Sequence, residues 1–251
     1  MKNKFECEVD NSRNKYWRNE EGKLHREDGP AVEGPNGDKA WFINGLKHRE
    51  DGPAIEYADG DKYWYINGEL HREGGPAVEK KDGTKEWLKN GKYHREDGPA
   101  IEYSNGAKCW YINGELHRED GPAMEYSNGD KKWFKNDQLH REDGPAVELI
   151  AGRKSWWLNG KQHREDGPAV EWANGKKEYY FNDYKIPEDF FDEYLKLKNQ
   201  VNDLQNKIKE LEKNESKCTT YENGDKEWVN EKNQLHRLDG PAVEYRNGDK
   251  E

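Results

Sequence analysis

Long hydrophobic runs are missing from this chain of 251 residues. Apolar residues make up only 31% of it, charged residues make up 37%, and the mean hydropathy is -1.44. No stretch approaches the roughly 20 apolar residues that a membrane-spanning helix needs. The N-terminus, MKNKFECEVD, also lacks the apolar segment of a secretory signal peptide. We therefore expect neither membrane insertion nor secretion, and we expect a cytoplasmic protein.

Cysteine and basic clusters are scarce as well. The three cysteines, Cys7, Cys109 and Cys218, are odd in number and far apart, which favours a reducing compartment over a disulfide framework. The net charge is -10 and no dense basic run occurs, so a general attraction to phosphate backbones or anionic lipids is not expected. These features predict no nucleic-acid partner and argue against a membrane partner.

Aromatic residues, by contrast, are plentiful. The chain has 10 Trp, 14 Tyr and 6 Phe, most of them at fixed spacing. Disordered segments are poor in aromatic residues, so the low hydropathy does not indicate disorder. We expect a folded chain with a thin core that is rich in rings.

The histidines show that the chain is a repeat. All 8 of them open a copy of one phrase, HREDGPA or a close variant, and the copies from His25 to His163 are 23 residues apart. Six tryptophans keep the same interval, each seven residues ahead of a histidine: Trp41, Trp64, Trp87, Trp110, Trp133 and Trp156. A fixed period of this size is typical of a repeat array.

Each repeat contains two Asn-Gly-like turns, such as YADGDK and INGEL. Asn-Gly between alternating residues predicts a β-hairpin, because a type I′ turn requires positive φ at both central positions. A strand such as DKYWYI lies between the turns, and Gly-Pro interrupts the returning strand, since proline cannot donate a ladder hydrogen bond. The predicted fold is therefore mainly β, an elongated antiparallel hairpin array, with one coiled-coil-type helix inserted near the C-terminus.

The side chains of each strand divide into columns, because successive residues point to opposite faces. The tryptophan column is nearly constant, whereas the next column varies and reads Ala40, Tyr63, Glu86, Cys109, Lys132, Ser155, Glu178 and Glu227. We expect the constant column to pack and the variable column to face solvent or a partner. The partner-binding candidates are Tyr63, Tyr65, Tyr111 and Trp157, although such rings can equally be structural.

The stretch WYINGELHREDGPAIEYADGDKYW combines landmarks of one known repeat family. The landmarks are a Trp, an Asn-Gly turn, a basic or His position, a glycine and a second glycine turn. In this order and period they resemble a MORN-type repeat, in a divergent HREDGPA variant of the kind seen in large DNA viruses and some bacteria. Asp-Gly-Pro replaces the Gly-x-Gly of the family, and the interval from Trp to His is one residue longer. The resemblance covers roughly residues 5–182 and 218–251, and it implies an adaptor, in the cytoplasm of an infected host cell where the source is a virus.

The His-Arg-Glu-Asp cluster has both a chemical and a structural interpretation. Histidines of adjacent repeats would stand about 9.5 Å apart, too far to share a metal ion. No Ser or Cys nucleophile and no phosphate-binding loop recurs beside them, so we expect no enzymatic activity and no cofactor or metal. An Arg can instead pair with carboxylates of its own loop or of the neighbouring one. The predicted structural residues between repeats are the six tryptophans together with His48, Arg49 and Glu56.

Glycine disappears between residues 187 and 216. Pro187 followed by two acidic residues predicts a helix start, and apolar residues then recur at spacings of three and four: Tyr194, Leu197, Val201, Leu204, Ile208 and Leu211. This heptad pattern favours a parallel dimer, in which Lys207 and Glu212 would pair. The alternative is that the helix folds back onto an aromatic face of the array.

Together these features predict three regions. Residues 1–186 form a repeat array with an N-terminal capping half-unit, residues 187–216 a helical insertion, and residues 217–251 a C-terminal repeat. The expected function is a non-catalytic scaffold that binds protein partners and forms a homodimer through its helix. The alternatives are a glycan-binding or choline-type cell-wall-binding repeat protein and a structural component of a virion.

Overall fold

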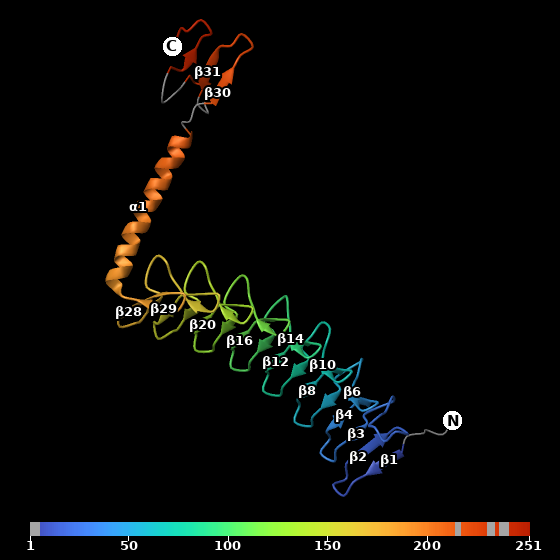
Figure 1. The fold of residues 1–251 in the computed structure, drawn as a ribbon. Coiled ribbons are helices and arrows are strands. Elements are labelled where there is room, and N and C mark those ends of the chain that lie inside the picture. The colour runs from blue at the N-terminus through green and yellow to red at the C-terminus, as the bar shows by residue number, and fades with distance from the viewer. Residues whose placement is uncertain (1–5, 214–216, 230–233, 236–240) are drawn as a thin grey trace. The chain divides into compact units, whose positions relative to one another are not determined.

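The computed structural model describes residues 6–213, 217–229, 234–235 and 241–251. It divides into two compact units, Met1–Ile186 and Pro187–Glu251. Among the described residues, no helix combines the length and the apolar character that crossing a bilayer requires. Figure 1 shows the strands of the first unit side by side in chain order.

One antiparallel sheet of 17 strands forms the backbone of the first unit. Each strand pairs with the strand before it and the strand after it in the following series. The series is β1 (Glu6–Val9), β2 (Lys15–Arg18), β3 (Val32–Glu33), β4 (Lys39–Ala40), β7 (Ile55–Glu56), β8 (Lys62–Tyr63), β11 (Val78–Glu79), β12 (Lys85–Glu86), β15 (Ile101–Glu102), β16 (Lys108–Cys109), β19 (Met124–Glu125), β20 (Lys131–Lys132), β23 (Val147–Glu148), β24 (Lys154–Ser155), β27 (Val170–Glu171), β28 (Lys177–Phe181) and β29 (Tyr184–Ile186).

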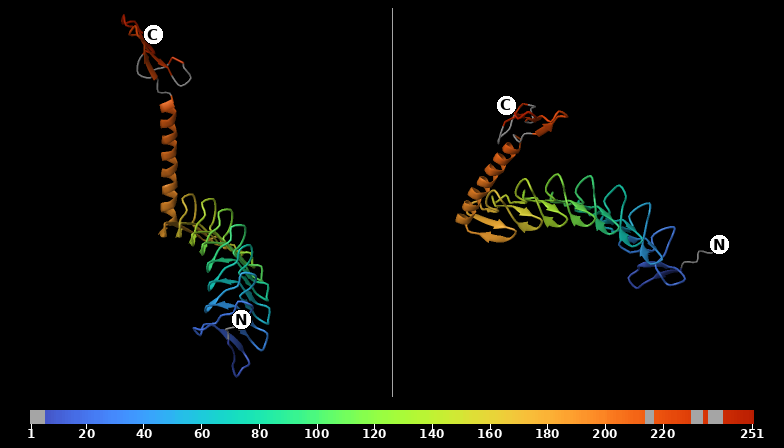
Figure 2. Two further views of the ribbon diagram at one scale, coloured as in Figure 1. Left: turned by 90° about the vertical axis from the view of Figure 1, so that its right-hand side faces the viewer. Right: turned by 45° about the horizontal axis from the view of Figure 1, so that its top comes forward.

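A second row of short hairpins accompanies this sheet. The pairs are β5 (Phe42–Ile43) with β6 (Leu46–Lys47), β9 (Tyr65–Ile66) with β10 (Glu69–Leu70), β13 (Leu88–Lys89) with β14 (Lys92–Tyr93), β17 (Tyr111–Ile112) with β18 (Glu115–Leu116), β21 (Phe134–Lys135) with β22 (Gln138–Leu139), and β25 (Trp157–Leu158) with β26 (Lys161–Gln162). Backbone bonds link successive hairpins; the Gly68 N–H, for example, donates to the Lys47 carbonyl at 2.8 Å, and the Arg49 N–H donates to the Tyr65 carbonyl at 3.1 Å. Figure 2 shows the loops of successive repeats stacked in the same orientation.

The tryptophan of each repeat marks the passage from the sheet to its hairpin. The Trp64 N–H donates to the Ala77 carbonyl at 2.8 Å, and the His71 N–H donates to the Trp64 carbonyl at 3.0 Å. These bonds divide the predicted continuous strand DKYWYI into the two short strands β8 and β9. The strand runs through without a break in β28, where Tyr179 stands at this position, and also in β2 and β31, which contain Trp17 and Trp228. The predicted fold class is confirmed, with more and shorter strands than the sequence pattern suggested.

The hairpin turns have the backbone that the Asn-Gly prediction requires. Asn67 has φ 50° and Gly68 has φ 88°, so both central residues are left-handed. The same asparagine position has φ between 49° and 54° in every repeat from Asn44 to Asn182. The regular period of the chain therefore becomes a regular series of antiparallel hairpins.

The core of the array is a thin line of small and branched side chains. In the first unit, the alanine of each DGPA or GGPA phrase has no exposed surface: Ala31, Ala54, Ala77, Ala100, Ala123, Ala146 and Ala169. The branched residues that follow are also buried in most repeats, Val78 at 2% exposure and Val170 at 1%. A chain with so little apolar surface is stabilised mainly between neighbouring repeats, as in other arrays.

Lysine and glutamate alternate across one face of the sheet. Register pairs Lys39 with Glu56 and Glu56 with Lys62, and the same alternation continues from Lys15 to Lys177. We name this side the loop face, because Glu56 also bonds to the arginine of its loop. The opposite side, which carries Tyr63 and Tyr65, is the tyrosine face.

The second unit contains α1 (Glu188–Lys213) and a sheet of three strands, β30 (Lys217–Thr220), β31 (Lys226–Val229) and β32 (Val243–Glu244). The acidic residues Glu188 and Asp189 occupy the first turn of α1, where they complement the helix dipole. The eighth copy of the repeat phrase begins at His236, which lies outside the described residues.

Candidate functional site

The arginine of the repeat phrase stacks on a tryptophan on the loop face. The Arg49 Cζ lies 4.0 Å from the centre of the Trp41 ring. Its Nε donates to Asp51 at 2.8 Å, and its Nη1 donates to the Pro53 carbonyl at 3.2 Å and to Glu56 at 2.9 Å. One planar guanidinium thus binds a ring, two carboxylates and a carbonyl, which a lysine ammonium cannot do in the same geometry.

The same arrangement recurs in seven copies among the described residues. Arginine-to-ring distances lie between 3.9 and 4.2 Å for the pairs Arg26–Trp17, Arg49–Trp41, Arg72–Trp64, Arg95–Trp87, Arg118–Trp110, Arg141–Trp133 and Arg164–Trp156. Arg72 has no aspartate because Gly74 takes its place, yet it keeps Glu79 at 2.8 Å and the Pro76 carbonyl at 3.0 Å. The arginine pairs with carboxylates of its own loop, which decides between the two pairings that the sequence left open.

The glycine of the phrase is needed because the guanidinium lies against it. A Cβ built on Gly52 would come within 2.8 Å of the Arg49 Cζ, and one on Gly121 within 2.9 Å of the Arg118 Cζ. Neither glycine has a positive φ, in contrast to the turn glycines such as Gly68. Space for the guanidinium, rather than backbone freedom, therefore selects glycine before the proline.

The histidine of the phrase fastens one hairpin to the next. The Asn67 N–H donates to the Nδ1 atom of His48 at 3.1 Å, and the Asn67 Oδ1 lies 3.0 Å from the same atom. Nδ1 accepts from the Asn67 N–H when the ring proton is on Nε2, and it donates to the Asn67 Oδ1 when the proton is on Nδ1, so either tautomer bonds the next hairpin. Nε2 faces Glu50 at 3.8 Å. The histidine nitrogens are thus occupied by the array itself.

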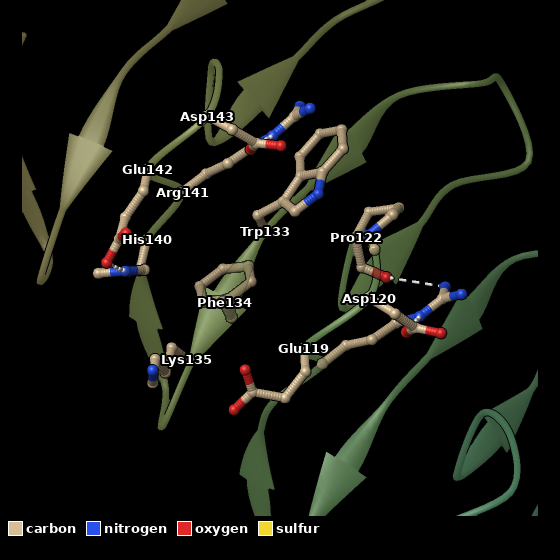
Figure 3. A pocket seen from close by; sticks show the side chains of 12 residues that line it. Glu119, Asp120, Pro122, Trp133, Phe134, Lys135, His140, Arg141, Glu142 and Asp143 are labelled. Carbon is tan, nitrogen blue, oxygen red and sulfur yellow. Dashed lines mark hydrogen bonds and ion pairs between the residues drawn. The ribbon is translucent and has the colours of Figure 1, made fainter.

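Shallow cavities open between successive loops of the loop face. Four consecutive cavities, of about 530 to 720 Å³, lie between the loops that begin at Arg49, Arg72, Arg95, Arg118 and Arg141. Figure 3 shows the largest, where the Arg141–Trp133 stack forms one side and the loop of Asp120 and Pro122 the other. Among the described residues, no group of three or more His, Cys, Asp or Glu side chains is arranged to hold a metal ion.

The arginines of the repeat phrase change the pKa of the aspartates in their loops. The hydrogen bond and charge of Arg49 lower the pKa of Asp51. The same cause lowers the pKa of Asp97, Asp120 and Asp143. These carboxylates stay ionised because an arginine holds them, so their shifts indicate structural ion pairs and carry no indication of a catalytic acid.

The four partner-binding candidates lie half-buried on the tyrosine face and contact other parts of the array. Tyr63 donates to Asp61 at 3.2 Å, and burial with this bond raises its pKa to about 12. The Lys47 Nζ lies 4.8 Å from the centre of the Tyr65 ring, and Tyr111 lies 5.2 Å from Tyr93. In a further repeat, the Trp157 Nε1 donates to the Ser155 hydroxyl at 2.9 Å.

The variable column does not face solvent as the sequence suggested. Cys109 is 5% exposed and Ser155 is 2% exposed, and the Glu86 and Glu178 side chains are 13% and 14% exposed. The column lies between the branched residues of the sheet and the rings of the hairpins, so each repeat meets a different local neighbour there. Glu86, for example, binds Lys80 and the Tyr93 hydroxyl. Variation in this column reflects local packing partners.

The residues predicted for oligomerisation lie on α1. Four apolar side chains of the seam are exposed: Leu197 at 55%, Val201 at 51%, Leu204 at 58% and Ile208 at 53%. Tyr194 is half-buried and lies 6.0 Å from Phe191. Leu211 belongs to the helix, but its side chain lies outside the described part. The seam is therefore an apolar strip over more than three helical turns.

Two segments of the chain match each other over a longer range than the 23-residue period reveals. Residues 217–251 align with residues 6–40 at a constant offset of 211, so that Cys218, Trp228 and Val243 match Cys7, Trp17 and Val32. The strand registers match too: Cys218 pairs with Trp228 as Cys7 pairs with Trp17. Comparison of the two irregular repeats with each other, rather than with the regular ones, would have found it. The last repeat is a second copy of the first.

The geometry is the basis for classifying this chain. No protein-family model matches it, and no curated protein matches it. It is a regular array of short antiparallel hairpins with a period of 23 residues, followed by a helix and a second copy of the first repeat.

Proposed function

We propose that the protein is a non-catalytic repeat scaffold that binds protein partners and pairs through α1. The observation that carries this proposal is the use of the recurring polar groups. In the described copies, arginine, aspartate, glutamate and histidine bind one another, a tryptophan ring and the backbone. Side chains whose polar atoms already bind other parts of the array are unsuited to catalysing a reaction.

The resemblance to MORN-type repeats supports an adaptor function. The hairpin array has the expected period and the expected order of tryptophan, Asn-Gly turn and glycine turn. Membership of that family is part of this proposal, since the Asp-Gly-Pro loop departs from the family pattern. A long array offers many equivalent positions for contact, which suits a protein that gathers partners.

Self-association is proposed for α1 with a second copy of the chain as its partner. Val201 and Ile208 occupy first core positions and Leu197 and Leu204 second ones, a distribution that favours two-stranded coiled coils. In a parallel pair, Glu193 would face Lys198 of the other copy, as Lys207 would face Glu212. An isolated seam of this length is marginal in water, so dimerisation is expected at micromolar or higher concentration.

The accessible rings of the tyrosine face are the proposed contact surface for other proteins. Tyr57 is 44% exposed, Tyr103 43% and Trp172 36%, more than the half-buried rings that the sequence singled out. Exposed Tyr and Trp side chains are common in interfaces because they bury a large area and keep a polar atom for bonding. Tyr63, Tyr65, Tyr111 and Trp157 support this surface from beneath or at its edge.

The dimer is tested by sedimentation equilibrium of the full chain. A monomer–dimer equilibrium is expected, and Leu204→Asn should weaken it at least tenfold because an amide would enter an apolar layer. Asp203→Asn is the matched control, as it changes an adjacent exposed residue outside the seam. A wild-type chain that stays monomeric at 100 μM, or equal weakening by both variants, would contradict helix pairing.

The scaffold proposal is tested separately by quantitative capture of proteins from the native host on wild-type and variant chains. Tyr103→Ala with Trp172→Ala should remove specific partners, whereas Leu204→Asn should leave them bound. A glycan array and a choline-affinity column test the rival class. Retention of a sugar or of choline with no specific protein bound would contradict the scaffold proposal.

A further inference from the structure

The tyrosine face has a cavity at its N-terminal end. It has a volume of about 600 Å³, within the usual range for small-molecule sites. Tyr16, Val32, Ala40 and Ile55 lie in one cross-strand row beneath it, paired in that order. Phe42 and Lys47, themselves a cross-strand pair, line it from the hairpin β5–β6.

The cavity exists because small residues meet at one place. Ala40 occupies the variable column where the next repeat has Tyr63, and Gly34 occupies the turn position where the next repeat has Tyr57. The two other small residues of the column are covered instead: Ser155 bonds to Trp157 and is 2% exposed, and Cys109 is 5% exposed. Around Ala40 the ring at the position of Trp157 is Phe42, which lines the cavity and leaves it open, and Val32 is only half-buried where Val78 and Val170 are buried.

Lys47 gives this apolar cavity a positive charge. The equivalent residues of the next repeats are Leu70 and Tyr93, which pack in the interior, so a half-buried lysine is unusual at this position. Its ammonium lies 4.8 Å from the centre of the Tyr65 ring. Among the described residues, no carboxylate forms an ion pair with it. The nearest acidic lining residue, Asp38, already accepts hydrogen bonds from Ala58 and Asn36.

We propose that this cavity, the Ala40 pocket, is a binding site for a small, flat, apolar molecule with one anionic group. The flat body would lie over Val32, Ala40 and Ile55 between the rings of Tyr16, Phe42 and Tyr57. The anionic group would bind the Lys47 ammonium at the rim, where the surrounding rings limit solvent access. The charge of Lys47 selects an anion, and the three aromatic rings of the lining favour a planar body that can pack against them.

The test uses 1-anilinonaphthalene-8-sulfonate, a planar anionic probe, titrated into the full chain with fluorescence detection. One probe per chain is expected. Ala40→Tyr should abolish the binding by filling the cavity with the side chain that the next repeat already accommodates at Tyr63. Lys47→Leu, which installs the residue found at position 70, should weaken the anionic probe about tenfold. It should leave the neutral probe N-phenyl-1-naphthylamine unaffected.

The matched control is Lys108→Gln, an exposed lysine on the loop face, which should bind the probe as the wild type does. Far-UV circular dichroism of each variant shows whether it folds. If Ala40→Tyr fails to fold, methyl NMR of the wild type replaces it: the Ile55 methyl signal should shift on titration while that of Ile112 stays. Unchanged binding by folded Ala40→Tyr, equal loss in the Lys108 control, or a stationary Ile55 signal would overturn the proposal.

Discussion

Replacement of one loop arginine tests how the array is held together. Arg118 lies 4.1 Å from the Trp110 ring centre, and it donates to Asp120 at 2.8 Å and to Glu125 at 3.2 Å. The prediction is that Arg118→Ala destabilises the array locally, and that Arg118→Lys recovers only part of the loss. Lysine keeps the charge but cannot stack on the ring and bind both carboxylates at once.

The magnitude follows from what the side chain contacts. Arg118 is 22% exposed, and its partners Asp120 and Glu125 are 84% and 36% exposed. The Asp120 pair is open to water and adds little, while the partly covered Glu125 pair contributes about 1 kcal/mol. The ring contact adds about 1 kcal/mol. We therefore expect Arg118→Ala to lower the free energy of unfolding by about 2–3 kcal/mol and Arg118→Lys by about 1–2 kcal/mol.

Hydrogen exchange followed by mass spectrometry or NMR is the assay, because it reports where protection is lost. The Trp110 N–H donates to the Ala123 carbonyl and the Arg118 N–H donates to the Phe134 carbonyl. Both amides should exchange faster in Arg118→Ala, whereas amides of β3 and β4 should keep their protection, since each repeat contacts mainly its neighbours. Urea unfolding measures the total loss.

Lys108→Gln is the control. Lys108 is an exposed lysine of β16 on the loop face, and its replacement should change the free energy of unfolding by less than about 0.5 kcal/mol. The reasoning is refuted if Arg118→Ala costs no more than this control. It is also refuted if protection falls evenly along the whole array, because the contacts of Arg118 would then not be local.

Three further outcomes follow from the same geometry. Gly144→Ala should destabilise the array by about 1–3 kcal/mol in urea unfolding, because its Cβ would come within 2.9 Å of the Arg141 Cζ. The Arg49 guanidinium lowers the pKa of Asp51. The stability from this pair is therefore present above about pH 4 and is lost as pH falls through the lowered pKa. Asp51→Asn should flatten the acid limb of a pH–stability profile. Burial and the bond to Asp61 raise the pKa of Tyr63 to about 12. The stability from this shift is therefore lost as pH rises from about 10 toward that value, and ultraviolet titration of Tyr63→Phe should lose one late-ionising tyrosine component while that of Tyr93, whose pKa is raised further, remains.

The hairpin array could be predicted because turn chemistry and period are local properties. Asn67-Gly68 forces left-handed backbone wherever it stands, and a strict interval converts one hairpin into many. The division of each strand at its tryptophan was not predictable in the same way. It depends on bonds from Trp64 to Ala77 and His71, residues whose proximity arises only when the hairpin folds back.

The sequence predicted which residues form the candidate site, but only part of how they are arranged. The recurrence of Trp, His, Arg and Glu identified the residues, and the structure shows which pairs meet. The face of the variable column was misjudged because variation within one chain has two causes, solvent exposure and differing buried neighbours. Ser155 under Trp157 and Glu86 against Lys80 are instances of the second cause. The residues of one column do not show which side chains pack against them. The sequence alone therefore cannot distinguish solvent exposure from a change of buried neighbour.

The second copy of the first repeat explains why that repeat departs from the others. Both copies open with a four-residue strand, β1 or β30, whereas the strands from β3 to β27 are two residues long. The longer strand pairs along the whole of β2 or β31. It therefore pairs backbone groups of β2 or β31 that a two-residue partner would leave unpaired. The four-residue opening strand is thus a feature of the irregular repeat itself, and it accounts for the departure of both copies from the regular pattern.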